Sequence, residues 1–185
     1  MPMRAEIYWI DGMPLGKLGI AARPRGGDWL DDEVEAWRAS GVDCVVSALT
    51  PAEEVELDLQ DEETACRQRG MQFVPSPIPD RGVPASSSSL RQVLSLVIEN
   101  LRADRTVLVH CRQGIGRASL IAACALAATG EGPDRAFSRI ERARGRPVPD
   151  TDEQRDWVRR FVAGRSNTQP ARGAYRRAAA RKAHV

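Results

Sequence analysis

The sequence has few of the features that mark membrane, secreted or zinc-binding proteins. Its 185 residues include no apolar run near the roughly 18 residues that cross a bilayer, and the first residues lack the apolar core of a secretory signal. The four cysteines form no Cys-x-x-Cys pair and the two histidines lie far apart, so neither a metal nor another cofactor is expected. We therefore expect a cytoplasmic protein with reduced thiols.

Acidic residues are absent from the C-terminal end. Residues 164–185 contain six Lys or Arg and no Asp or Glu, which leaves 21 basic against 25 acidic residues in the rest of the chain. We predict one domain over residues 1–163 and a basic, flexible tail over 164–185. A solvated end is the preferred interpretation of such a tail, and contact with nucleic acid or an acidic membrane surface is the alternative.

Strands and helices alternate along the predicted domain. Apolar, β-branched runs predict strands at 7–10, 18–22, 42–49, 71–74 and 107–109. Apolar residues at helical spacing predict helices at 29–39 (capped by Asp28), 61–69, 90–101, 118–129, 133–144 and 151–163, with one further turn after Pro51. This alternation predicts an α/β fold with a mainly parallel central sheet flanked by helices.

The most informative stretch is residues 106–130, which reads as a buried strand, a glycine-bearing turn and an apolar helix. Unpaired N–H groups and the positive end of the dipole make the start of such a helix a binding site for phosphate-like anions. Cys111 lies in this field at the start of the turn, where a thiolate nucleophile is favoured. Arg117, six residues later, can hold two oxygens of a phosphoryl group.

Residues 110–117, His-Cys-Arg-Gln-Gly-Ile-Gly-Arg, resemble the His-Cys-x5-Arg signature of the cysteine-dependent protein-tyrosine and dual-specificity phosphatases. The resemblance extends upstream to Pro77-Ile78-Pro79-Asp80 and covers about residues 5 to 163. It implies a small, single-domain phosphatase of the bacterial type. In the reaction that it implies, a thiolate attacks phosphorus, an Asp protonates the leaving oxygen, and water hydrolyses a cysteinyl-phosphate.

The resemblance assigns roles to particular residues. It implies that Cys111, Arg117 and Asp80 are catalytic. The phosphate-binding loop comprises Arg112, Gln113, Gly114, Ile115, Gly116 and Arg117. It also implies that His110 shapes this loop and that Gln154 positions the hydrolytic water. Simpler interpretations remain open, because His110 fits a buried imidazole bonded to backbone and Gln154 fits a capping box with Thr151.

Asp80 follows one predicted strand and Cys111 follows the next, with one helix between them. Such a crossover makes the two strands parallel, so both loops leave the same edge of the sheet, where α/β proteins bind ligands. A simple turn role for Asp80 in Pro-Asp-Arg-Gly is the alternative. Asp104 is the main rival for the role of the acid, but it precedes the strand that ends at Cys111, so we expect it at the opposite edge.

Two positions carry separate hypotheses. Ala118 stands where the family usually has Ser or Thr, and Ser119 is rotated from it by about 100° around the helix. We therefore expect a slow second step and a detectable phospho-enzyme. Cys44 lies in another apolar strand, where it is either plain core or a resolving thiol that protects Cys111 on oxidation.

The function predicted from these residues is a protein phosphatase of tyrosine or dual specificity, with phosphorylated proteins as substrates. A phosphatase for a phosphoinositide or another small phosphoester is an alternative within enzymes. A pseudophosphatase that binds phosphoresidues without turnover is the alternative from another class. A sulfurtransferase also has a cysteine loop near a helix, but its loop differs in length and needs no acid at Asp80.

Overall fold

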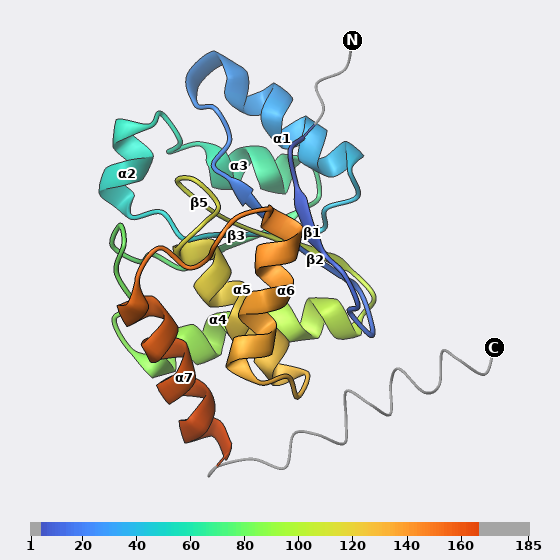
Figure 1. Ribbon diagram of the computed structural model, residues 1–185. Helices are drawn as coiled ribbons and strands as arrows, with labels where there is room; N and C mark the ends of the chain where they lie inside the picture. Colours follow the sequence, from blue (N-terminus) through green and yellow to red (C-terminus); the bar gives the residue numbers. More distant parts are fainter. Residues whose placement is uncertain (1–4, 167–185) are drawn as a thin grey trace, which may run out of the picture.

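A five-stranded sheet forms the centre of the computed structural model, which describes residues 5–166 (Figure 1). The strands are β1 (Tyr8–Ile10), β2 (Lys17–Ala22), β3 (Cys44–Ser47), β4 (Gln72–Pro75) and β5 (Thr106–Cys111), in the spatial order β1-β2-β5-β3-β4. β2, β5, β3 and β4 run parallel, and only the edge strand β1 is antiparallel to its neighbour. The predicted α/β fold with a mainly parallel sheet is therefore confirmed.

Helices follow the predicted order with small differences in their bounds. They are α1 (Leu30–Ala39), α2 (Pro51–Glu56), α3 (Glu62–Gln68), α4 (Ser87–Arg102), α5 (Arg117–Ala128), α6 (Pro133–Arg144) and α7 (Asp152–Ser166). Asp28 does not cap α1 as predicted, because it lies in a 3-10 turn (Gly27–Trp29) and makes no capping bond. Within residues 5–166, no helix is both long and apolar enough to cross a membrane. The predicted tail lies outside the described residues from 167 onward.

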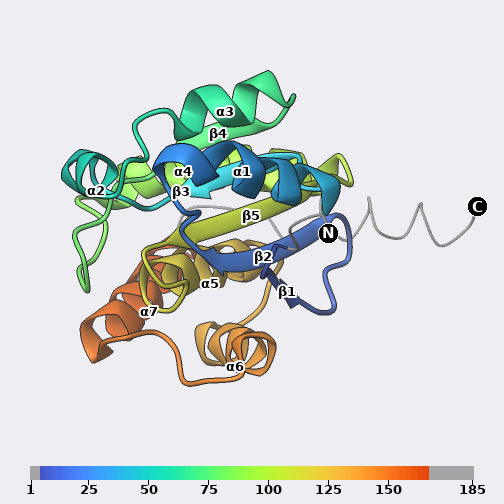
Figure 2. The same cartoon turned by 90° about the horizontal axis from the view of Figure 1, so that it is seen from above.

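The sheet separates two apolar layers. α1 and α3 cover one face, and α5, α6 and α7 cover the other (Figure 2). Side chains alternate along β5, so Val107, Val109 and Cys111 join the core with α5, whereas Leu108 joins the core with α1. His110 accordingly points away from the layer that contains the Cys111 side chain.

Both predicted catalytic loops leave the same edge of the sheet. β4 and β5 each pair in parallel with β3, which lies between them. The segment with Asp80 and the segment that begins at Cys111 therefore emerge side by side, as predicted. Asp104 lies at the other end of β5, where its Oδ1 accepts a hydrogen bond from the N–H of Gly16 at 3.0 Å, and this placement removes it as a rival acid.

The hypothesis of Cys44 as a resolving thiol is wrong. Cys44 pairs with Val107, four residues before Cys111 on β5, which separates the two cysteines by about 13 Å along the strand direction. A disulfide requires Cα atoms less than about 7 Å apart. Burial raises the pKa of the Cys44 thiol to about 12, so this residue is part of the core.

Candidate active site

The junction between β5 and α5 forms the centre of the site. β5 ends at Cys111, and Gly116 stands at the N-cap of α5 without a side-chain cap bond. The first N–H groups of α5 therefore have no capping side chain and are free to bind a ligand. The Cys111 side chain lines a cavity of about 110 Å³, although the residue is only 3% exposed. The other lining residues are Asp80, Arg81, Arg112, Gln113, Gly116, Arg117 and Asp150.

Arg144, at the end of α6, supports the loop between β5 and α5 by hydrogen bonds to its backbone carbonyls. Its Nε donates to the carbonyl of Gly114 at 3.0 Å and its Nη2 to the carbonyl of Gln113 at 3.3 Å. The guanidinium of Arg144 also stacks over the Tyr8 ring, 4.1 Å from the centroid. Because N–H and C=O point in opposite directions across a planar peptide, holding these carbonyls outward turns the linked N–H groups to the other side.

Gly114 is required by both its conformation and its surroundings. Its φ is +64°, and a Cβ built there would lie 2.5 Å from the backbone carbonyl of Ala21 in β2. Gly145 has a similar φ of +73°, but a Cβ there would meet nothing within 4 Å. Both glycines thus have a left-handed backbone conformation, but an added Cβ would clash with neighbouring atoms only at Gly114.

Replacing Gly114 with alanine is expected to be far more damaging than replacing Gly145. Both variants lose about 1 kcal/mol through left-handed strain, and Gly114→Ala should lose about 1–3 kcal/mol more through overpacking. It should also lower the predicted phosphatase activity at least about tenfold, because displaced loop groups no longer match the ligand. Urea denaturation and initial rates measure both effects, and equal losses in the two variants would contradict this account.

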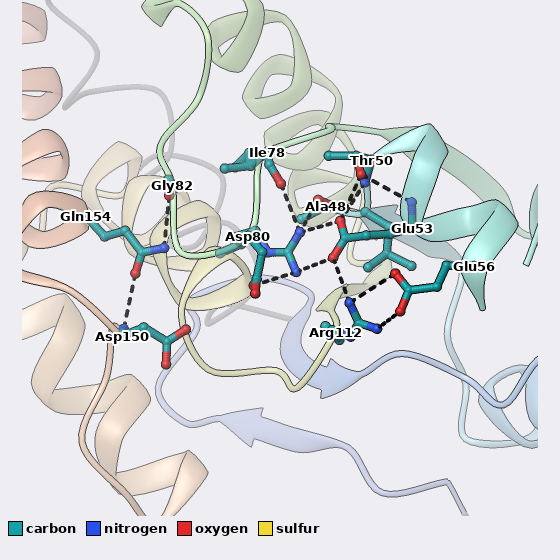
Figure 3. Close-up of polar contacts among 12 residues, drawn as sticks. Ala48, Thr50, Glu53, Glu56, Ile78, Asp80, Gly82, Arg112, Asp150 and Gln154 are labelled. Carbon is teal, nitrogen blue, oxygen red and sulfur yellow. Dashed lines mark hydrogen bonds and ion pairs between the residues drawn. The ribbon is translucent and has the colours of Figure 1, made fainter.

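Arg117 is buried rather than directed freely into the cavity. Only 2% of it is exposed, and its guanidinium binds Glu53 of α2 through two hydrogen bonds of 2.7 and 2.9 Å. Nη2 also donates to Oδ1 of Asp80 at 3.1 Å, and Nη1 donates to the carbonyls of Ile78 at 2.9 Å and Ala48 at 3.4 Å (Figure 3). Burial would lower the pKa of Arg117, but the hydrogen bonds to Glu53 outweigh it and raise the pKa.

Glu53 is a site residue that the sequence analysis missed. It forms a capping box at the start of α2, in which its Oε2 accepts from the Thr50 N–H at 2.9 Å and its own N–H donates to Thr50 Oγ1 at 3.3 Å. Burial would raise the pKa of Glu53, but hydrogen bonds from Arg117 and Thr50 outweigh it and lower the pKa to about 2. The pattern Thr-Pro-x-Glu signals the capping box, but nothing local signals that Glu53 reaches Arg117.

Asp80 and Arg112 both lie at the rim of the cavity. The Asp80 side chain is 59% exposed and has one oxygen on Arg117, so the predicted acid and the predicted clamp are in direct contact. The Arg112 guanidinium turns toward α2, where it binds the carboxylate of Glu56 and lies 3.9 Å from Glu53 (Figure 3). Gln113 is exposed beside it, whereas Ile115 packs into the core and anchors the loop.

His110 has a charged neighbour instead of the backbone partner that the simpler interpretation expected. Its Nε2 lies 2.8 Å from Oε1 of Glu62, and both side chains are at most 1% exposed. The two groups are close without the alignment of a hydrogen bond. The His110 ring also lies 5.5 Å from that of Trp37. His110 therefore supports the end of β5 from the face opposite Cys111.

Gln154 links the loop that carries Asp80 to the segment that carries Asp150. Its N–H donates to Thr151 Oγ1 at 3.2 Å, but its side chain does not complete the expected capping box. Instead Nε2 donates to the carbonyl of Gly82 at 2.9 Å, and Oε1 accepts from the N–H of Asp150 at 3.1 Å. The amide is fully buried. A water-positioning role for Gln154 stays a prediction, whereas its structural link between the loops is direct.

Ser119 does not replace the missing hydroxyl at Ala118 by any contact in the structure. Both residues are fully buried at the start of α5. The Oγ atom of Ser119 makes no hydrogen bond within the described part of the chain. The expected accumulation of a phospho-enzyme therefore stays a prediction.

Comparison with known proteins agrees with this geometry. Cyclin-dependent kinase inhibitor 3 of Rattus norvegicus is 26% identical over 170 residues, which are 84% of this chain and 78% of the rat protein. The fold matches kinase associated phosphatase (KAP), solved with serine in place of its catalytic-site cysteine, with a TM-score of 0.79 at 20% identity over 91% of this chain and 100% of that one. Tk-PTP in its active form matches with a TM-score of 0.70 at 25% identity, over 87% of this chain and 99% of that one.

These similarities place the chain among the cysteine-dependent protein-tyrosine and dual-specificity phosphatases. Within them, residues 19–131 match the family described as "Polymorphic toxin system, DSP-PTPase phosphatase". That match spans more than half of the chain, and the chain belongs to this family. The matched region contains β5, the loop and α5, as well as Asp80 and Glu53.

Proposed function

We propose that this chain hydrolyses phosphomonoesters on phosphorylated proteins, with tyrosine or dual specificity, and needs no metal or other cofactor. The observation that carries the proposal is that Cys111 and Arg117 line one small cavity at the N-terminus of α5. A nucleophile, an anion-binding helix start and a guanidinium there match what phosphoryl transfer requires.

In the first step, loop N–H groups and Arg117 hold the phosphoryl oxygens while Sγ of Cys111 attacks phosphorus. The bond from phosphorus to the leaving oxygen breaks, and that oxygen takes a proton from the Asp80 carboxyl. A phosphoryl oxygen can replace Asp80 on Nη2 of Arg117, to which Asp80 is now bonded. Substrate binding would then release the acid to the leaving group.

The charge of the rim favours a phosphorylated side chain over a phosphoinositide. Recognition of a headgroup with several phosphates needs a cluster of available cations. Of the three arginines that line the cavity, Arg112 is paired with Glu56 and Arg117 with Glu53, and two carboxylates, Asp80 and Asp150, line the cavity together with Arg81. A single phosphoryl group reaching Arg117 and the loop amides fits this arrangement better.

The proposal is tested by phosphate release from p-nitrophenyl phosphate and from phosphotyrosine and phosphothreonine peptides, with EDTA present throughout. We expect turnover, inhibition by vanadate, and a covalent phospho-enzyme after acid quench, because Ala118 slows its breakdown. Turnover that needs an added divalent cation would contradict the proposal. Peptide binding without turnover would instead support the pseudophosphatase alternative.

A further inference from the structure

The third arginine of the cavity lining differs from the other two in having no acidic partner. Arg117 is paired with Glu53, and Arg112 is paired with Glu56. Arg81 is exposed and lines the same cavity, and within residues 5–166 its guanidinium makes no hydrogen bond or ion pair. The charge of Arg81 therefore remains available to a negatively charged group of a substrate.

The backbone of Arg81 lies in a turn that holds the residue at the rim. The N–H of Gly82 donates to the carbonyl of Pro79 at 2.8 Å, which closes a four-residue turn with Arg81 as its third residue. The φ of Arg81 is +56°, and a positive φ at this position of a turn favours glycine or asparagine over a long side chain. The carbonyl of Gly82 accepts from Nε2 of the buried Gln154 at 2.9 Å, which ties the turn to α7. Strained residues of this kind persist where surrounding contacts impose them, and they gather at functional sites.

Arg81 stands on the side of the cavity from which the rest of a substrate extends. It directly follows Asp80, which the proposed function assigns to the oxygen that links phosphorus to the substrate. The phosphoryl oxygens are held at the inner end of the cavity, by Arg117 and by the N–H groups at the start of α5. A side chain next to Asp80 therefore meets the part of the substrate that adjoins the phosphorylated residue.

We propose that Arg81 selects substrates with an acidic residue next to the phosphorylated one, a specificity that rests on the proposed function. The planar guanidinium of Arg81 can bind a carboxylate through two parallel N–H···O bonds. Asp80 and Asp150, which line the cavity with it, cannot attract an acidic residue. Arg112 is already engaged with Glu56. Because the contact lies outside the reacting group, Arg81 changes which peptide is preferred and leaves the chemical step as it is.

The test compares two phosphotyrosine peptides that differ only in charge. One has Glu on both sides of the phosphotyrosine, and the other has Gln at the same two positions. The ratio of kcat/KM for the Glu peptide to that for the Gln peptide should be about threefold higher in the wild type than in Arg81→Asn, which is the effect of an exposed ion pair. Asn tolerates a positive φ, so the denaturant midpoint of this variant should not lie below that of the wild type.

Two further variants show whether the charge at this position is the cause. Arg81→Glu should reverse the preference, so that a third peptide with Lys at the two positions becomes the best of the three. Arg146→Asn removes an exposed arginine that lies four residues before Asp150 and does not line the cavity, and it should keep the preference of the wild type. High salt should weaken that preference, because it screens exposed charges. All four proteins should hydrolyse p-nitrophenyl phosphate, which has no neighbouring residue, within about twofold of one another.

Two results would overturn the role of Arg81. One is the same ratio for the two peptides in the wild type and in Arg81→Asn. The other is a loss toward p-nitrophenyl phosphate as large as the loss toward the Glu peptide, because Arg81 would then act on the phosphoryl group or on Asp80. Failure of the proposed function looks different, because the wild type would then release no phosphate from any of the peptides and Cys111→Ser would match the wild type.

Discussion

Cys111→Ser is expected to lower the turnover of p-nitrophenyl phosphate by at least about 10⁴-fold, since removal of a nucleophile costs on the order of 10⁶ in kcat in a comparable case. A serine hydroxyl fits the same space but stays protonated beside a helix start that favours a thiolate. Arg117 and the loop amides remain, so phosphate should still bind the variant. Initial rates and phosphate titration measured by calorimetry separate these two properties.

Cys44→Ser provides the matched control. It makes the same chemical change in the same core layer, but Cys44 pairs with Val107, which lies four residues before Cys111 on β5. This variant should be less stable, because it buries a hydroxyl, and yet keep its activity at temperatures where it is folded. Equal loss of activity in the two variants would show that the effect of Cys111→Ser comes from packing and not from chemistry.

Glu53→Ala is expected to lower the free energy of unfolding by about 3–5 kcal/mol, because it leaves the buried Arg117 cation without its main partner. It should also lower kcat/KM about 100-fold, since a misplaced anion clamp loses its orientation. Denaturant midpoints and initial rates measure the two losses. Glu56→Ala, on the same helix, removes only the exposed partner of Arg112 and should cost at most about 1 kcal/mol.

The pH dependence of stability gives an independent check on Glu53. Its pKa of about 2 in the folded protein lies below the ordinary value of 4.5. A group with a lowered pKa stabilises the fold above its unfolded value, and this contribution is lost as the pH falls from about 4.5 to about 2. The wild type should therefore lose stability across that window more steeply than Glu53→Ala, and equal slopes would contradict the ion pair.

The loop between β5 and α5 could be predicted because its parts are contiguous in the sequence. A strand, a turn and a helix in succession place Cys111 and Arg117 at one helix start, and the crossover rule brings Asp80 to the same edge of the sheet. Helix bounds differ by a few residues, because caps such as Ser86 at α4 compete with neighbouring serines of similar preference.

The remaining parts of the site depend on contacts between distant segments. Glu53 reads as a helix cap and Arg144 as a cation in a last helical turn, and both interpretations are sufficient locally. Their additional roles arise only when α2 and α6 pack next to the loop. Gln154 shows the same limit, because Thr151 and Gln154 form half of the predicted capping box while the side-chain amide binds elsewhere.

The residues that support the loop between β5 and α5 extend past the region that matches the family model. The family match ends at residue 131, whereas Arg144, Asp150 and Gln154 all follow it. A fragment cut at that boundary would still contain Cys111, Arg117 and Asp80. It would lose the hydrogen bond from Arg144 to the carbonyl of Gly114 and the hydrogen bond from Gln154 to Gly82 on the loop that carries Asp80. Substitutions downstream of the signature would thus change the geometry of the loop, while leaving the signature intact.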